Sequence, residues 1–406
     1  MNKRISVGLT LANPLRLIIP VVLVVLAGRA FNANAQTETN LHSFVGGTAD
    51  GSLPYAGLVQ GSDGNFYGTT EYGGTSGTGT VFRISPSGSY TNLYSFGRSP
   101  TDGELPKAGL VQGRDSNFYG TTGFGGTSGT GTVFRISPSG SYTNLYSFGR
   151  SATDGANPRG GLVQGRDSNF YGTTEQGGTR GFGTVFRISP SGNYTSLYSF
   201  GSSATDGANP RAKLVQGRDS NFYGTTEYGG TSGTGTVFRI SPSGSYTSLY
   251  SFGSCATDGK LPRAGLVQGS NGNFYGTTSF GGTYNSGTVF RISPRGGYTN
   301  LYSFGRSPND GVYPYGGLVQ GSDGNFYGMT QQGGTRSVGT VFRISPSGSY
   351  TNLYSFGRSP TDGKLPKARL VQGNDGNFYG TTQQGGTTGN GTVFKLTVPL
   401  SPRPIQ

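Results

Sequence analysis

Apolar and aromatic residues occur along this chain in short runs, and none of the runs has the 3.6-residue period of a helix. Between residues 57 and 96 the runs cover 57–60, 65–70, 79–85 and 90–96, and Tyr, Phe, Val, Ile and Thr dominate them. Gly, Pro, Asn, Asp and Ser separate the runs, as is typical of strands joined by turns. The pattern predicts an all-β protein.

The same four runs return in seven copies. The tetrapeptide Asn-Phe-Tyr-Gly marks each copy, at a spacing of 52 residues; it begins at Asn65, Asn117, Asn169, Asn221, Asn273, Asn325 and Asn377. A fixed period without insertions indicates one structural unit per copy. Four antiparallel strands in about 50 residues match the size of a propeller blade. We therefore predict a seven-bladed β-propeller of four-stranded antiparallel blades.

The two ends of the repeat region fit together. The seventh copy stops after its third run, at 391–397, so it lacks a fourth strand. Residues 39–44, before the first copy, read Thr-Asn-Leu-His-Ser-Phe and match Thr-Asn-Leu-Tyr-Ser-Phe at 91–96. A strand from the N-terminus would complete the last blade and close the ring, leaving no unpaired end blade. We expect a propeller over residues 36–398 and a short C-terminal tail over 399–406.

The first 35 residues have the layout of a secretory signal peptide. Lys3, Arg4 and Arg16 precede an apolar run over 17–28, which leads to an Ala-Asn-Ala sequence ending at Ala35. A membrane anchor is the alternative, but Pro20 interrupts the run, and a spanning helix needs about 20 apolar residues. We expect cleavage near Ala35, a secreted protein (extracellular or periplasmic), and no transmembrane segment in the mature chain.

Positive charge is in excess over the whole chain, with 31 Lys and Arg against 18 Asp and Glu, and a net charge of +13. This favours an acidic partner, and we expect an acidic polysaccharide or a cell-surface protein, with no nucleic acid and a monomeric state. Cys255 is the single cysteine, so no intramolecular disulfide forms. Neither Cys255 nor the single His42 has neighbours in the sequence that would suggest a metal, so we expect no metal and no cofactor.

The repeated unit also resembles a known family. Its order of Gly-Leu-Val-Gln-Gly, Asp-Gly-Asn-Phe-Tyr-Gly-Thr-Thr, Gly-Gly and Gly-Thr-Val-Phe resembles the GloVer tandem repeat of bacterial "choice-of-anchor" proteins, over residues 39–397. A looser similarity is to kelch blades, in which a Gly-Gly pair also follows the second strand, as Gly73-Gly74 does here. The resemblance implies an exported repeat protein with a kelch-like propeller organisation, and it transfers no defined activity.

Propeller geometry places the two long loops of each copy, 71–78 and 97–108 in the first, on one face, which we expect to carry binding. Residues that differ between copies on that face are the candidates. One ring follows the recurring proline: Tyr55, Lys107, Arg159, Arg211, Arg263, Tyr315 and Lys367. A second set, directly before the Gly-Gly pair, is aromatic: Tyr72, Phe124, Tyr228 and Phe280. Cations and aromatic rings suit a ligand that bears carboxylates or sulfates, whereas the alternative is a set of solvated loop ends.

Three functions stay open at this point. The preferred one is an exported, non-catalytic binding or scaffolding module for anionic glycans or surface proteins. The alternatives are a polysaccharide hydrolase or lyase at the channel mouth, using Glu71, Glu175 and Glu227, and a purely structural protein of the envelope or matrix. No nucleophile or metal set accompanies these carboxylates, so we assign no catalytic residue. The loop aspartates, Asp50 and its equivalents, we expect to brace turns rather than to bind Ca²⁺.

Overall fold

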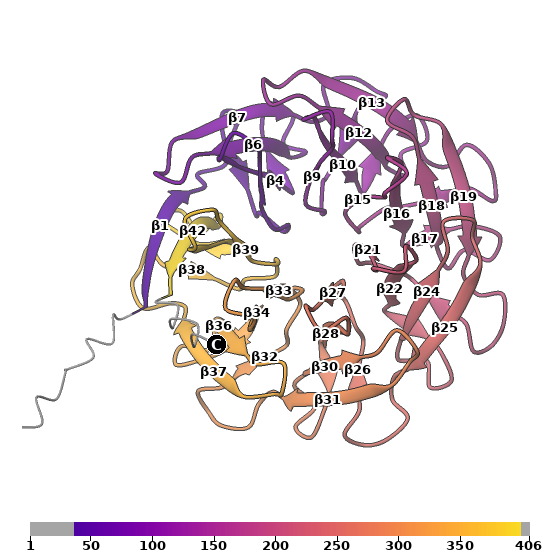
Figure 1. The fold of residues 1–406 in the computed structure, drawn as a ribbon. Coiled ribbons are helices and arrows are strands. Elements are labelled where there is room, and N and C mark those ends of the chain that lie inside the picture. Colours follow the sequence, from indigo (N-terminus) through magenta and orange to yellow (C-terminus); the bar gives the residue numbers. More distant parts are fainter. Residues whose placement is uncertain (1–35, 399–406) are drawn as a thin grey trace, which may run out of the picture. The chain divides into compact units, whose positions relative to one another are not determined.

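The structure, a computed structural model, describes residues 36–398, which form a closed ring of blades around a central channel (Figure 1). These residues contain strands and no helix, so the all-β prediction is confirmed. No helix that could cross a membrane is found in this described part of the chain. The predicted signal peptide and the predicted C-terminal tail lie outside it.

Each blade is a four-stranded antiparallel sheet whose first strand lies at the channel and whose fourth lies at the rim (Figure 1). In the first blade these are β3 (Val59–Gln60), β4 (Phe66–Thr70), β6 (Thr80–Ile84) and β7 (Tyr90–Ser95). The predicted runs are thus confirmed as strands. The innermost strand keeps only two residues, because the chain turns away at both ends.

The next five blades repeat this order. They consist of β9 (Val111–Gln112), β10 (Phe118–Thr122), β12 (Thr132–Ile136) and β13 (Tyr142–Ser147); β15 (Val163–Gln164), β16 (Phe170–Thr174), β18 (Thr184–Ile188) and β19 (Tyr194–Ser199); β21 (Val215–Gln216), β22 (Phe222–Thr226), β24 (Thr236–Ile240) and β25 (Tyr246–Ser251); β27 (Val267–Gln268), β28 (Phe274–Thr278), β30 (Thr288–Ile292) and β31 (Tyr298–Ser303); and β33 (Val319–Gln320), β34 (Phe326–Thr330), β36 (Thr340–Ile344) and β37 (Tyr350–Ser355).

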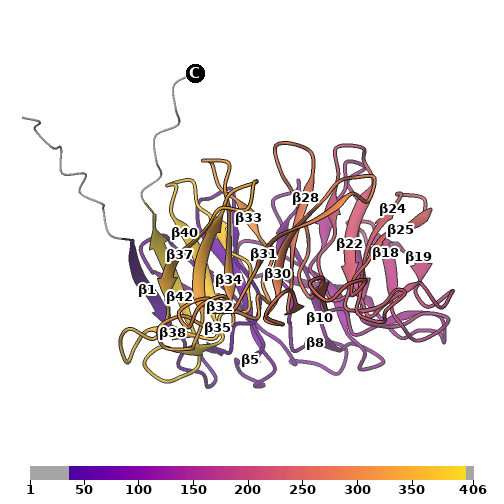
Figure 2. The same cartoon turned by 90° about the horizontal axis from the view of Figure 1, so that it is seen from below.

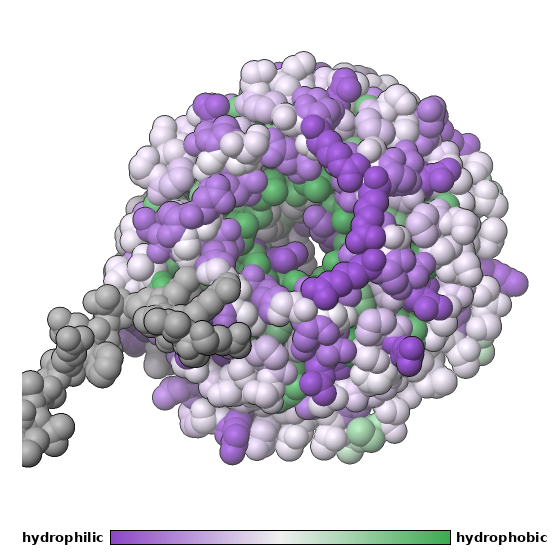
Figure 3. All heavy atoms as spheres, viewed as in Figure 1, coloured by the Kyte–Doolittle hydropathy of each residue, from purple (hydrophilic) through white to green (hydrophobic). Residues whose placement is uncertain are grey.

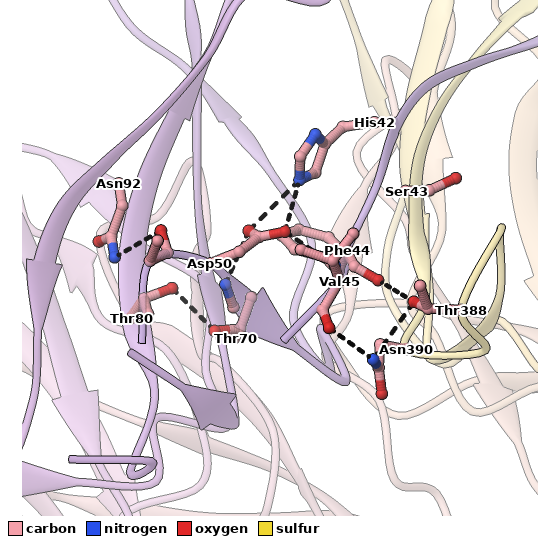
Figure 4. Close-up of polar contacts among 12 residues, drawn as sticks. His42, Ser43, Phe44, Val45, Asp50, Thr70, Thr80, Asn92, Thr388 and Asn390 are labelled. Atoms are coloured by element: carbon pink, nitrogen blue, oxygen red, sulfur yellow. Dashed lines mark hydrogen bonds and ion pairs between the residues drawn. The ribbon is translucent and has the colours of Figure 1, made fainter. Parts of the chain in front are cut away.

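The seventh blade is completed by the N-terminal strand, as predicted. Its strands from the channel outward are β39 (Val371–Gln372), β40 (Phe378–Thr382), β42 (Thr392–Thr397) and β1 (Thr37–Ser43). β1 pairs antiparallel with β42, from Thr37 opposite Thr397 to Ser43 opposite Thr392. Beyond β1, the Asn390 amide and the Thr388 hydroxyl donate hydrogen bonds to the main-chain carbonyls of Val45 and Phe44 (Figure 4). The ring is therefore closed by main-chain pairing and by side chains.

Stacked aromatic pairs join each blade to the next. The ring of Tyr67 in the first blade lies 4.0 Å from that of Phe118 in the second, and the same pair recurs around the ring. Tyr379 of the seventh blade and Phe66 of the first close the series, also at 4.0 Å. We call this junction of the first and seventh blades, which includes β1, the seam. These residues are the Phe-Tyr of the recurring tetrapeptide, and both are fully buried. The repeat motif therefore forms a stacked aromatic contact between neighbouring blades.

The long loop that leads into each blade pairs, in a two-stranded sheet, with the long loop after the second strand of that blade. These small sheets pair β2 (Gly51–Ser52) with β5 (Tyr72–Gly73), β8 (Gly103–Glu104) with β11 (Phe124–Gly125), β14 (Gly155–Ala156) with β17 (Gln176–Gly177), β20 (Gly207–Ala208) with β23 (Tyr228–Gly229), β26 (Gly259–Lys260) with β29 (Phe280–Gly281), β32 (Gly311–Val312) with β35 (Gln332–Gly333), and β38 (Gly363–Lys364) with β41 (Gln384–Gly385). They lie together on one face, and the hairpin turns lie on the other (Figure 2). The sequence analysis missed them, because a two-residue strand has no period.

A buried aspartate braces each long loop. In the second blade one Asp102 oxygen accepts the Tyr94 hydroxyl at 2.9 Å and the Arg98 amide at 3.1 Å, and the other accepts the Gly103 amide at 2.8 Å. At the seam Asp50 binds the amides of Val45 and Gly51 and faces the ring of His42 (Figure 4). The expectation that these aspartates brace turns is confirmed.

Candidate functional site

The seven residues that follow the recurring prolines line one cavity, at the long-loop end of the channel. Its volume is about 160 Å³, and it takes a side chain from every blade. We call these residues the mouth ring: Tyr55, Lys107, Arg159, Arg211, Arg263, Tyr315 and Lys367. The structure therefore brings together all seven positions that the sequence singled out.

Backbone geometry turns each of these side chains toward the channel. The residue before the proline has a left-handed φ of between 53° and 58° in every copy, although none of the seven is a glycine: Leu53, Leu105, Asn157, Asn209, Leu261, Tyr313 and Leu365. A bulky side chain seldom adopts this conformation. The surrounding bonds hold it here; for example, the Leu105 amide donates to the Thr78 carbonyl at 2.8 Å and the Leu105 carbonyl accepts the Gly123 amide at 3.2 Å. The mouth ring is thus set on a rigid backbone.

Three buried carboxylates bind four of the five cations of the mouth ring. Glu71 pairs with Lys107 at 3.0 Å. Glu175 pairs with Arg159 and Arg211. Glu227, which is fully buried, pairs with Arg211 at 2.7 Å and with Arg263 at 2.6 Å. Burial opposes the charge on Arg211, but Glu227 and Glu175 outweigh it and raise the pKa of Arg211. The carboxylates considered for catalysis are therefore counter-charges of the mouth ring.

Lys367 is the cation of the mouth ring without a carboxylate partner among the described residues. Its ammonium nitrogen lies 5.2 Å from the ring centre of Tyr55 and 5.8 Å from that of Tyr315. Burial lowers the pKa of Lys367; the charge of Glu71 opposes this shift, and Arg263 and Lys107 add to it. Five cations thus face the three carboxylates that bind them. The mouth keeps an excess of positive charge.

Aromatic side chains surround the mouth ring on the same face. Tyr72, Phe124 and Tyr228 are exposed, whereas Phe280 is half-buried. Phe124 lies 6.0 Å from the Lys107 nitrogen, and Phe280 lies 5.6 Å from the Arg263 guanidinium, both within reach of cation–π contact. Exposed Phe182 and Tyr284 add two more rings in the neighbouring loops. The sequence analysis missed these two, because they stand in the most variable part of the unit.

Inside the channel lies a larger cavity of about 400 Å³. Leucine, valine and glycine of the inner strands line it, and Figure 3 shows the apolar lining through the opening. Two cations, Lys213 and Arg369, also line it. The sequence analysis missed both residues. The signal was present, because the other five copies have glycine at this position.

The hairpin-turn face carries a second set of cations. Arg114, Arg166 and Arg218 stand in the first turn of three neighbouring blades, and all are exposed. The Arg114 guanidinium donates to the Arg166 carbonyl at 3.2 Å and to the Ser168 hydroxyl at 2.6 Å, and Arg166 reaches the next turn in the same way. Figure 3 shows a hydrophilic band beside the opening, along the side that these blades form. The sequence analysis considered only the long-loop face.

Sequence comparison identifies the family. The sequence profile described as the Gloeobacter/Verrucomicrobia repeat matches residues 27–218, 101–271 and 214–401. A search of curated proteins found no match.

Solved structures resemble the fold at low identity. The extracellular domain of a B. thetaiotaomicron protein named as the hybrid two component system BT4673 has 12% identity and a TM-score of 0.60, with 91% of this chain and 40% of that chain covered. The corresponding domain named for BT3049, from the same organism, has 12% identity and a TM-score of 0.57, with 86% and 40% covered. This chain thus spans less than half of either. These likenesses show the fold alone, and the family rests on the profile: the chain belongs to the Gloeobacter/Verrucomicrobia repeat family.

Proposed function

We propose that this protein is an exported, non-catalytic binding module that takes an acidic polysaccharide on its long-loop face. One observation carries the proposal. The seven residues that break the repeat on that face line a single cavity, and their positive charge exceeds that of the carboxylates bound to them. Side chains at solvated loop ends need not line a common cavity.

The chemistry around the mouth fits a sugar polymer with acid groups. Arginine and lysine bind carboxylate or sulfate groups through charge-assisted hydrogen bonds. Exposed Tyr72, Phe124 and Tyr228 offer flat apolar faces beside these cations. Such rings combine an apolar body with a rigid shape, which suits contact with a sugar ring. A polymer lying across the face would meet cations and rings from several blades at once.

A non-catalytic role accords with the state of the three glutamates. Each forms an ion pair with one or two mouth-ring cations, and all three are buried. The carboxylates are thus engaged by the cations of the mouth ring, and no nucleophile accompanies them. Export accords with the predicted signal peptide and with the extracellular origin that is named for both fold neighbours.

The test is salt elution of the mature protein from immobilised polygalacturonate, with dextran as the neutral control. The variant is Lys367→Tyr, because tyrosine already stands at this position in two copies and no glutamate loses a partner. We expect this variant to elute at a lower salt concentration than the native protein, since exposed ionic contacts are screened by salt.

The matched control is Arg295→Ser, which removes one cation from an exposed turn where five other copies have serine. It should elute as the native protein does. If both variants shift equally, retention reports net charge alone, and the proposed mouth site is wrong. If neither shifts, or if the native protein passes through the column, the proposal also fails.

A further inference from the structure

Five copies of the repeat place a glycine where the inner strand lines the channel. Neighbouring blades approach closely there; a Cβ on Gly109 would lie 2.9 Å from the Gly57 carbonyl oxygen, and one on Gly265 would lie 2.5 Å from that of Lys213. The absence of a side chain therefore has a packing reason at these positions. Lys213 and Arg369 are the two departures from glycine. Each places a long cationic side chain in the channel cavity of about 400 Å³, which we call the lumen.

The two cations enter the lumen from opposite sides. Lys213 belongs to the fourth blade and Arg369 to the seventh, and no two blades of a seven-membered ring are further apart. The Lys213 side chain extends over Gly161, with its Cδ 3.7 Å from the Cβ position there. Arg369 extends likewise over Gly317, at 3.9 Å. Both side chains line the same cavity, with apolar side chains such as Val163 and Val319 around them.

Neither cation has a counter-charge among the described residues. No carboxylate lines the lumen cavity, and neither Lys213 nor Arg369 forms an ion pair or a hydrogen bond there. Burial lowers the pKa of Lys213 to about 8, and Arg369 also lowers it. Arg369 is accessible to solvent through the open channel, yet burial lowers its pKa too. Lys213 is half-buried and Arg369 is exposed to the channel, so a bound anion would neutralise two partly desolvated cations that have no counter-charge.

We propose that the lumen is a binding site for a small organic acid, whose carboxylate lies between Lys213 and Arg369 and whose apolar body packs against the leucine and valine lining. The cavity of about 400 Å³ is of the size that small-molecule sites have, roughly 300–1,000 Å³. An apolar wall with a few convergent polar groups is also typical of such sites. The lumen cavity adjoins the mouth cavity, because Lys213 and Arg369 line both. This site goes beyond the proposed function, because it takes a small ligand inside the channel rather than a polymer across the face.

The test is ¹⁹F NMR titration of the mature protein with 4-fluorobenzoate at pH 7, with 4-fluorobenzamide as the neutral isostere. We expect saturable binding of the acid and no saturable binding of the amide. Lys213→Gly and Arg369→Gly, which install the residue of the other five copies, should each weaken binding at least tenfold. Lys213→Met, which keeps the apolar stem, should weaken it to the same extent.

A pH series separates a charged site from a merely apolar one. Between pH 7 and 9.5 the native protein should lose affinity as Lys213 loses its proton, and the Lys213→Gly protein should not follow that change. Lys367→Tyr should leave binding of the acid unchanged, because Lys367 lines the mouth cavity and does not line the lumen cavity. Equal binding of acid and amide, no binding of the acid, or loss of binding in Lys367→Tyr with retention in Lys213→Gly would each overturn the lumen site. The last of these outcomes would leave the mouth proposal standing.

Discussion

At the scale of single residues, the mouth depends on which glutamate stands before which cation. Glu71, Glu175 and Glu227 each occur 36 residues before a mouth-ring cation with which they pair. The other four copies have Gly, Ser or Gln in place of the glutamate. Their mouth-ring residues, counted around the closed ring, are Arg159, Tyr315, Lys367 and Tyr55. A glutamate is thus always matched by a cation, whereas the four copies without a glutamate have two cations and two tyrosines. The balance of glutamates and cations sets the charge of the mouth.

Replacing Glu227 by Gln tests this balance. Breaking a buried ion pair typically costs about 3–5 kcal/mol, and we expect about 2 kcal/mol because Arg211 and Arg263 are partly exposed. Chemical denaturation should show this fall in the free energy of unfolding. Retention on polygalacturonate should rise at the same time, since two cations are released.

The control for that prediction is Glu104→Gln. Glu104 lies on the same face and forms no ion pair with any described residue, so this variant changes net charge equally. Its stability and retention should stay close to those of the native protein. A Glu227→Gln protein that behaved like the control would mean that the ion pairs do not govern the mouth.

The residue scale also shows where the sequence is informative. The mouth ring could be predicted because each member directly follows a proline at a fixed spacing. The pairing of Glu71 with Lys107 could not, because it depends on how a loop of one blade packs against the start of the next. Lys213 and Arg369 stood out as departures from glycine, but only the closed ring shows that they share a lumen.

At the scale of elements, β1 is a near copy of the other outer strands, but Glu38 and His42 stand where those strands have tyrosine. Outer strands begin with a tyrosine that packs within its blade and against the neighbouring one, as Tyr142 does on Phe134 and Tyr94. In β1 the equivalent residue is Glu38, which lies near Asp362 and Tyr354. Burial, with Asp362 adding to it, raises the pKa of Glu38 to about 7 from its usual 4.5. Burial at the seam therefore favours the protonated, uncharged form of the Glu38 carboxyl group.

Glu38→Gln should make the seam less sensitive to pH. Because folding raises the pKa of Glu38, the contribution of this residue to the free energy of unfolding is fully present below about pH 4.5. That contribution is lost as the pH rises from 4.5 to 7. The variant lacks this loss, so we expect equal melting temperatures at pH 4.5 and a more stable variant at pH 8.5. The gain should be up to about 1 kcal/mol, since Glu38 is partly exposed. A variant that is less stable than the native protein at pH 8.5 would show that the carboxylate supports the seam.

The strands and hairpins could be predicted with their bounds nearly correct, because alternation and turn residues act locally. The seven two-stranded sheets of the long loops could not, because they join residues such as Gly51 and Gly73 across a whole hairpin. The backbone of these loops is also unusual: both residues of the Gly-Gly sequence are left-handed, and so is the leucine, asparagine or tyrosine before the proline. Such conformations are imposed by the surrounding blade and leave little trace in residue type.

At the scale of the whole molecule, seven nearly identical blades carry an unequal distribution of chemistry. Arg114, Arg166 and Arg218 mark one side of the hairpin-turn face, exposed aromatic rings occupy the long-loop face of the first five blades, and two opposed cations occupy the lumen. The ring itself could be predicted from the one-strand offset of the repeat. The distribution of chemistry became readable only once each residue had a place on that ring.

Removal of residues 36–43 tests how the ring is held. The deletion leaves β42 as an exposed edge, because β1 is its outer partner. We expect a lower melting temperature and association through the open edge in size-exclusion chromatography. A synthetic peptide of residues 36–45 should restore the melting temperature and the monomer by adding back the strand, whereas a scrambled peptide should not. Unchanged stability of the deleted protein would show that the aromatic stack of Phe66 on Tyr379 suffices at the seam.

The pairing of β1 with β42 also affects the order in which the chain can be synthesised and folded. β1 is among the first described segments to be synthesised, yet its partner, β42, ends at Thr397. For most of that time the first strand has no correct neighbour, while six blades can form behind it from local hairpins. A chain interrupted before its seventh copy would present an unpaired first strand and an incomplete circle to proteases. Closure therefore requires the last copy as well as the first strand, because β1 finds its partner only in β42.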